Sequence, residues 1–410
     1  MKRGILPYIL ILFLTLLCFL VHFSDQSDSM LNDFNRVVSN EYLTSAVEFH
    51  KSLPAFQKRP LTTFLINETV LRTKISIGTA FIIVNFLFLF ISGVLIYHIS
   101  LLFEKSNKMA IGNIIIYFTS FSILFAFFPP IYTYDEPVQF CLLLLSLISI
   151  YKEKWWRYIV LFSLSLIARE SGLILLPGLM LIIIYKDGTF SLKTSINKEN
   201  LFKFGYLTVS IVVYFIFLRV FLEQNDISQE SKSDFRDRLS HYYLNVQNQK
   251  HAFESLISFF LVLGMPLYLL FNGVKKKITN LNKYSIYVRA FLITVIINSM
   301  VVLLTTKARE ARLFVIPMFF IWPIFTKLFY EDMKLLTSVK YYISTFRKLN
   351  YVAFFAFLNI LNYILSFKVY ETTVGDPNEN YFNEYLFITL FLILTHATLK
   401  HNLNTSSKNT

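Results

Sequence analysis

The sequence predicts an all-α fold, a polytopic transmembrane helical bundle of about 12 spans. Of its 410 residues, 55% are hydrophobic and only 16% are charged, whereas soluble domains carry about 25% charged residues. Apolar runs of bilayer-spanning length recur along the whole chain. The shortage of charge excludes an ordinary soluble enzyme and a disordered chain. We expect a single integral membrane domain over residues 1–410.

The first helix is expected over residues 5–23. It follows a basic start, and no small-x-small cleavage site ends the run, so we expect it to be uncleaved. The segments 157–168 and 172–185 are short for two spans and predict a helical hairpin that turns at 168–171. The further apolar segments are expected near residues 77–102, 109–128, 135–151, 157–168, 172–185, 204–222, 255–272, 289–305, 313–330, 350–368 and 384–400.

The net charge of +13 would suggest nucleic acid as a partner of a soluble protein. In a membrane protein, Lys and Arg instead gather in cytoplasmic loops. With the spans above, basic residues greatly exceed acidic ones in the loops assigned to the cytoplasm, but not in the external loops. Both termini are then cytoplasmic, and the expected partner is the lipid bilayer rather than nucleic acid.

Three external stretches are long enough to carry chemistry, and the third, residues 368–384, is expected to be a turn-rich loop. The first, residues 24–76, shows apolar residues at spacings of three and four from Leu31 to Phe49, which predicts amphipathic helices lying in the membrane interface. The second external loop covers residues 223–254. His50 and His241 lie in these loops, and we expect both to be solvated surface residues.

Charged residues recur where apolar segments meet the external side. Each set has a simple structural reading: helix caps for the first-loop aspartates, a solvated turn, a structural ion pair, or a cluster of charges that ends a span. The candidates are Asp25, Asp28 and Asp33 after the first segment, Lys58 and Arg59 in a basic turn, Asp135 and Glu136 before the fourth segment, Arg169 and Glu170 in the hairpin, and Arg309, Glu310 and Arg312 between two later segments.

Together these residues provide a possible general base and several anion-binding groups on one side of the membrane. A general base takes the proton from an attacking hydroxyl, and arginine forks bind phosphate oxygens at two points. A lipid phosphate entering sideways from the outer leaflet fits such a set. No cluster indicates zinc, whereas a hard divalent cation such as Mg or Mn on Asp and Glu stays possible.

This layout resembles the polytopic glycosyltransferases of the C fold, which use polyprenyl-phosphate sugars. Carboxylates soon after the first segment, an acidic pair at a later external turn and the run from Arg169 to Pro177 carry the resemblance, which covers motifs in residues 1–185. It implies an inverting transfer of a hexose or pentose to a lipid, glycan or protein acceptor. The resemblance assigns the base to Asp25, Asp28 or Asp33, acceptor or metal orientation to Asp135 and Glu136, and donor-phosphate binding to Lys58, Arg59, Arg169, Arg309 and Arg312.

Two alternatives stay open. A surface-polysaccharide polymerase or ligase would depend on the second external loop, where Arg236, Arg238 and His241 occur. A carrier or flippase would have charged or broken helices at the bilayer midplane. Heavy use of Lys, Asn, Ile, Phe and Tyr favours an AT-rich bacterial genome, so we expect an inner (plasma) membrane location and a role in the cell envelope.

Overall fold

The computed structural model describes residues 4–23, 40–126, 134–184, 198–224, 241–272, 284–375 and 381–406. Within these ranges every regular element is a helix, so the predicted all-α class is confirmed. Helices are the expected solution for an apolar chain in a bilayer, because they satisfy their own backbone hydrogen bonds.

Six helical segments in these ranges are long and apolar enough to cross a membrane. The chain is therefore a multi-pass integral membrane protein, while the larger number of spans stays a prediction. The six are α5 (Ile77–Glu104), α12 (Lys198–Gln224), α15 (Gln249–Phe271), α17 (Ser285–Thr305), the continuous segment of α21 (Leu349–Tyr363), the π-helix η6 (Ile364–Val369) and α22 (Tyr370–Val374), and α23 (Phe382–Ser406).

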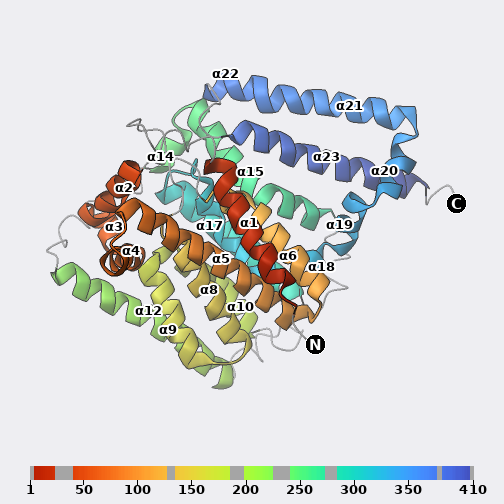
Figure 1. Cartoon of the computed structure of the whole chain (residues 1–410). Helices are drawn as coiled ribbons and strands as arrows, with labels where there is room; N and C mark the ends of the chain where they lie inside the picture. The colour runs from red at the N-terminus through yellow and green to blue at the C-terminus, as the bar shows by residue number, and fades with distance from the viewer. Residues whose placement is uncertain are drawn as a thin grey trace.

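Shorter helices pack between and around these segments. Helix α8 packs along α5 and α9, and α9 packs along α12, so these helices form one dense group in the lower half of Figure 1. The short helices are α1 (Leu6–Phe23), α6 (Asn107–Thr119), α7 (Phe121–Leu124), α8 (Glu136–Tyr151), α9 (Trp155–Ala168), the 3-10 helix η2 (Glu170–Leu175), α10 (Leu176–Ile184) and α14 (His241–Val246).

The predicted first external loop contains three helices, α2 (Asn40–Ser52), α3 (Pro54–Gln57) and α4 (Pro60–Thr73). They lie together on the left of Figure 1, where α2 and α4 pack against α5 and α3 packs against α2. Leu43 and Val47 form the buried face of α2. Each follows directly after a residue of the predicted apolar stripe, so the buried face is displaced by one position. Phe49 of that stripe is exposed, because α2 turns its Leu43 row toward α5. The earlier part of the stripe lies outside the described residues.

The prediction of one continuous helix over residues 109–128 is wrong. Helix α6 ends at Thr119, and Ser120 adopts an extended backbone before α7. The Ser120 hydroxyl donates to the carbonyl oxygen of Ile116 at 2.7 Å and accepts from the Trp322 indole at 2.9 Å. Such local side-chain bonds compete with helix continuation, which explains the break.

The predicted α-helical span over 313–330 is also wrong. This segment is a series of 3-10 helices, η3 (Ala311–Phe314), η4 (Ile316–Phe320) and η5 (Trp322–Ile324), followed by α18 (Phe325–Leu328). Pro317 and Pro323 lack the backbone donor that a continuous helix needs. Asn113 of α6 compensates, because its amide donates to the Pro323 carbonyl at 2.6 Å and accepts from Thr326 N at 2.8 Å.

The C-terminal part forms a separate layer of helices. Helices α19 (Tyr330–Thr337) and α20 (Val339–Phe346) lead to α21, which runs beside α23 at the top of Figure 1. Large apolar side chains of α21, including Phe354, Phe357 and Ile360, are exposed. Exposed apolar surface of this extent is what a lipid-facing helix presents.

Candidate functional site

A cavity of about 330 Å³ lies among α8, η2, α17 and the η3–η4 segment. One part of its wall is charged and carries Arg59, Glu136, Arg169, Glu170 and Arg312. The rest is mainly apolar, with some uncharged polar side chains. Its apolar side chains are Phe140, Leu173, Ile174, Val301, Val302, Leu313, Val315 and Ile316. The cavity is therefore amphipathic, with charged groups gathered in one region of an apolar wall.

The charged groups arise where helices end. Helix α9 stops at Ala168, and Arg169 has an extended backbone (φ −165°) that redirects the chain into η2. Gln139 of α8 fixes this turn, because its amide donates to the Arg169 carbonyl at 2.7 Å and to Ser171 Oγ at 3.1 Å. The helix thus ends at the predicted turn of the hairpin, and the hydrogen bonds of Gln139 fix the conformation of that turn.

Glu136 is the shared acceptor at the centre of the site. It is 3% exposed, and Oε1 accepts a hydrogen bond from Nη1 of Arg169. Nη1 of Arg312 lies 3.4 Å from the same oxygen, and the Tyr134 backbone N–H donates to Oε2 at 3.0 Å. Two guanidinium groups thus converge on one carboxylate.

Glu170 binds a second pair of cations. Arg59 donates to it in a two-point fork, from Nε to Oε2 at 2.7 Å and from Nη2 to Oε1 at 2.6 Å. Lys58 Nζ lies 3.6 Å from Oε1. Burial disfavours the charged form of Arg59, but attraction to Glu170 outweighs it and raises the Arg59 pKa. These ion pairs hold the first external loop against the hairpin.

Arg312 is the most accessible guanidinium of the group. Its side chain is 22% exposed, and it donates from Nε and Nη2 to Oε2 of Glu310 at 3.2 and 2.9 Å. Burial opposes its charge, but Glu136 and Glu310 raise its pKa. Arg312 therefore stays positively charged in the wall of the cavity.

Asp135 lies buried beside this network, as the residue before α8. Burial raises the pKa of Asp135 to about 7, with a further rise from Glu136 and opposition from Arg59. The two neighbouring carboxyls thus differ: Glu136 faces two arginines, whereas Asp135 can hold a proton near neutral pH. Such a difference is common in functional sites.

The expectation that His50 is solvated is wrong. Its ring stacks on Tyr134, with ring centroids 3.6 Å apart, and also contacts Phe56. Burial, followed by the charge of Arg59, lowers the His50 pKa to about 3. The Tyr134 hydroxyl bonds Thr63 Oγ1 at 2.9 Å. This aromatic stack joins α2, α3 and α4 to the chain just before Asp135.

The structure brings most of the predicted site residues together, namely Lys58, Arg59, Asp135, Glu136, Arg169, Glu170, Glu310 and Arg312. Arg309 is directed elsewhere, with Nη1 3.4 Å from Nε2 of His251. His241 begins the separate helix α14 and is partly buried, so the expectation that it is solvated is not met in full. Asp25, Asp28 and Asp33, like Arg236 and Arg238, lie outside the described residues.

Two polar residues of the cavity wall were missed from the sequence. Gln139 is fully buried, and Asn298 of α17 donates to the Leu313 carbonyl at 3.0 Å. Each is a lone amide within an apolar helix, a pattern that marks polar contacts inside a membrane protein. Within the described ranges no group of three or more His, Cys, Asp or Glu side chains is arranged to hold a metal ion.

Comparison of this chain with protein-family models, with curated proteins and with solved structures finds no match.

Proposed function

We propose that the protein is a membrane glycosyltransferase that moves a sugar from a polyprenyl-phosphate donor to a lipid, glycan or protein acceptor on the external face. The observation that carries this proposal is the amphipathic cavity, with Arg59, Arg169 and Arg312 in one wall and apolar side chains around them. An anionic lipid headgroup with an attached apolar chain matches both kinds of surface.

The cavity also lies close to the lipid phase. Helix α17 supplies Val301, Val302 and Thr305 to its wall, while Ile296 and Met300 of the same helix are exposed. Only this one helix need separate the cavity from the hydrocarbon on that side. A lipid donor can therefore reach the charged groups from the bilayer without crossing water.

The chemistry follows from the charges. An aspartate base removes the acceptor hydroxyl proton, the oxygen attacks the anomeric carbon, and the carbon–phosphate oxygen bond breaks to release polyprenyl phosphate. Arg312 and Arg169 stabilise the phosphate as it gains charge. The base is assigned to Asp25, Asp28 or Asp33, and Asp135 and Glu136 orient the acceptor.

The test is a binding measurement with undecaprenyl phosphate as the probe and undecaprenol as its neutral analogue. Purified protein in detergent should retain the phosphate in native mass spectrometry and release the alcohol. Arg312→Gln should lower the bound fraction roughly tenfold, the worth of one charge-assisted hydrogen bond. Arg72→Gln is the matched control, because Arg72 lies on α4 with an 80% exposed side chain.

Activity is tested by the lipid-linked sugars of a deletion strain. Wild-type protein should restore the missing sugar, whereas Asp25→Asn, Asp28→Asn and Asp33→Asn, singly or together, should identify the base. Full activity of the triple variant would exclude this mechanism. Altered polymer length with unchanged sugar units would favour the polymerase, and saturable uptake by vesicles would favour the carrier.

A further inference from the structure

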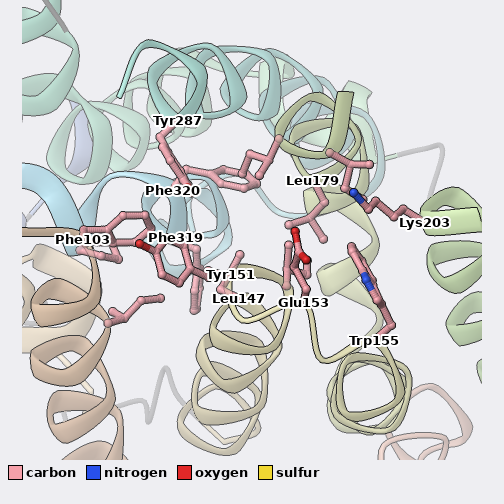
Figure 2. Close-up of a pocket in the computed structure, with 15 residues that line it drawn as sticks. Phe103, Leu147, Tyr151, Glu153, Trp155, Leu179, Lys203, Tyr287, Phe319 and Phe320 are labelled. Carbon is pink, nitrogen blue, oxygen red and sulfur yellow. The ribbon is translucent and has the colours of Figure 1, made fainter. Parts of the chain in front are cut away.

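A second cavity, of about 170 Å³, lies at the opposite end of α8 from the site (Figure 2). Gln139 of α8 lines the first cavity, and Tyr151 lines the second. Twelve helical residues separate them, a rise of about 18 Å. Segments of α8, α10, α17 and η4 contribute to the wall of the second cavity. It is therefore a distinct space and not an extension of the charged site.

The wall of the second cavity is mostly aromatic and aliphatic. Phe103, Phe319 and Tyr287 lie on one side, and Leu179, with Glu153 and Trp155 nearby, lies on the other (Figure 2). Apolar walls of this kind accept a hydrocarbon chain and give no hydrogen bonds to a polar solute. The charged side chains, Glu153 and Lys203, lie on the side of Leu179 (Figure 2).

Lys203 is the buried charge in this wall. The residue is 7% exposed and extends from α12 toward Leu179 (Figure 2). Its ammonium donates to Glu199 at 2.5 Å, which uses one of its donors, and the acidic Glu153 lines the same cavity. A buried Lys is rare unless it is paired, and an ammonium carries three donors. An anion in the cavity would satisfy it.

We propose that this second cavity binds part of one acyl chain of an anionic phospholipid from the cytoplasmic leaflet, with the lipid phosphate at Lys203. Lys152 and Lys154, both exposed, flank the cavity beside Trp155. Basic residues and tryptophan together are typical of a helix end at the membrane interface. The distribution of charge along the chain assigns this end to the cytoplasm, where anionic lipids attract basic groups.

The test uses phosphatidylglycerol as the probe and phosphatidylcholine as the uncharged comparison. The full chain is purified in detergent, incubated with each lipid and examined by native mass spectrometry. We expect preferential retention of one phosphatidylglycerol. Lys203→Gln should lower that bound fraction roughly tenfold, whereas Lys203→Arg should restore it because the charge is kept.

Lys108→Gln is the matched control, since Lys108 is exposed on α6 at the same end of the bundle. It should leave retention unchanged, and an unchanged melting temperature shows that each variant is folded. Equal retention of the two lipids, or no effect of Lys203→Gln, would overturn the proposal. Displacement of phosphatidylglycerol by undecaprenyl phosphate would also overturn it, by assigning the cavity to the donor. None of these readouts depends on glycosyl transfer.

Discussion

Two groups of charged and polar side chains in the described part of the chain differ in whether they face a cavity. The site cluster consists of Arg59, Glu136, Arg169, Glu170 and Arg312 and lines the larger cavity. The α23 cluster consists of Tyr268 and Asn272 of α15 and its C-cap, Asp332 of α19, and His396 and Lys400 of α23.

The α23 cluster is closed on itself. His396 Nε2 lies 3.0 Å from Asp332 Oδ1, and its Nδ1 lies 2.9 Å from the Tyr268 hydroxyl. Lys400 donates to the Asn272 carbonyl at 2.7 Å and to Asp332 at 3.4 Å. The contacts of His396 and Lys400 join α23 to α15 and to α19. Such a network fixes how helices pack.

The site cluster is open by contrast. Its cations face a cavity, and Glu136 is shared between two of them at unequal distances. An anion that enters the cavity can bind Arg312 without breaking the hydrogen bonds of Gln139 that hold the turn at Arg169. The comparison teaches that a buried charge in this protein marks a site only where it also faces a cavity.

The largest expected effect comes from removing the close cation of Glu136. Arg169→Ala leaves that carboxylate with Arg312 alone, at 3.4 Å. We expect a loss of about 3 kcal/mol in unfolding free energy, because the buried carboxylate loses its close cation and keeps only the longer contact to Arg312. Chemical denaturation in detergent measures it, with Arg72→Ala as the exposed control. Wild-type stability in Arg169→Ala would show that the site is hydrated and not held by this ion pair.

Disrupting the α23 cluster should lower stability and leave the binding of undecaprenyl phosphate unchanged. Asp332→Asn removes the charge that holds His396 and Lys400. We expect about 2 kcal/mol lower stability, within the range for hydrogen bonds to charged groups. Retention of undecaprenyl phosphate should stay at the wild-type level, as native mass spectrometry would show. A tenfold loss of binding would contradict the distinction between the two clusters.

Gln139 sharpens the same comparison at the site. Gln139→Leu removes the bond to the Arg169 carbonyl while keeping an apolar side chain of similar size. We expect a loss of about 1 kcal/mol in stability. If Gln139 positions Arg169 for binding, Gln139→Leu should also weaken the binding of undecaprenyl phosphate. That loss of binding should be larger than the small loss of stability explains. Ser146→Ala is the control on α8, since Ser146 bonds only its own helix at Leu142. Equal effects in both variants would make Gln139 a purely structural residue.

Apolar runs were enough to predict the helical class and most helix positions, because hydrocarbon length and backbone satisfaction constrain them. Charged residues at helix ends predicted the members of the site cluster. Their pairing was not predictable: Arg59 and Glu170 are 111 positions apart and meet only through the packing of α4 on α9. The 3-10 segment depends on Asn113 of α6 and was missed for the same reason.

A pH-dependent effect is expected at Asp135, whose pKa of about 7 exceeds the ordinary carboxyl value near 4. The folded state then binds this proton more tightly than the unfolded state. The stability that it contributes is complete below about pH 4 and is lost as the pH rises through 7. Asp135→Asn is neutral throughout and should therefore match the wild type at pH 4 but melt higher at pH 8.

Thermal melts in detergent at pH 4, 6 and 8 measure this difference, because the other acids titrate in both proteins and cancel. Glu68→Gln serves as the control, since Glu68 lies on α4 in a surface pair with Arg72. A lower melting temperature of Asp135→Asn at pH 8 would mean that the ionised carboxylate is held by Arg59. Asp135 would then belong with Glu136 among the paired anions, and its different role beside the cavity would be lost.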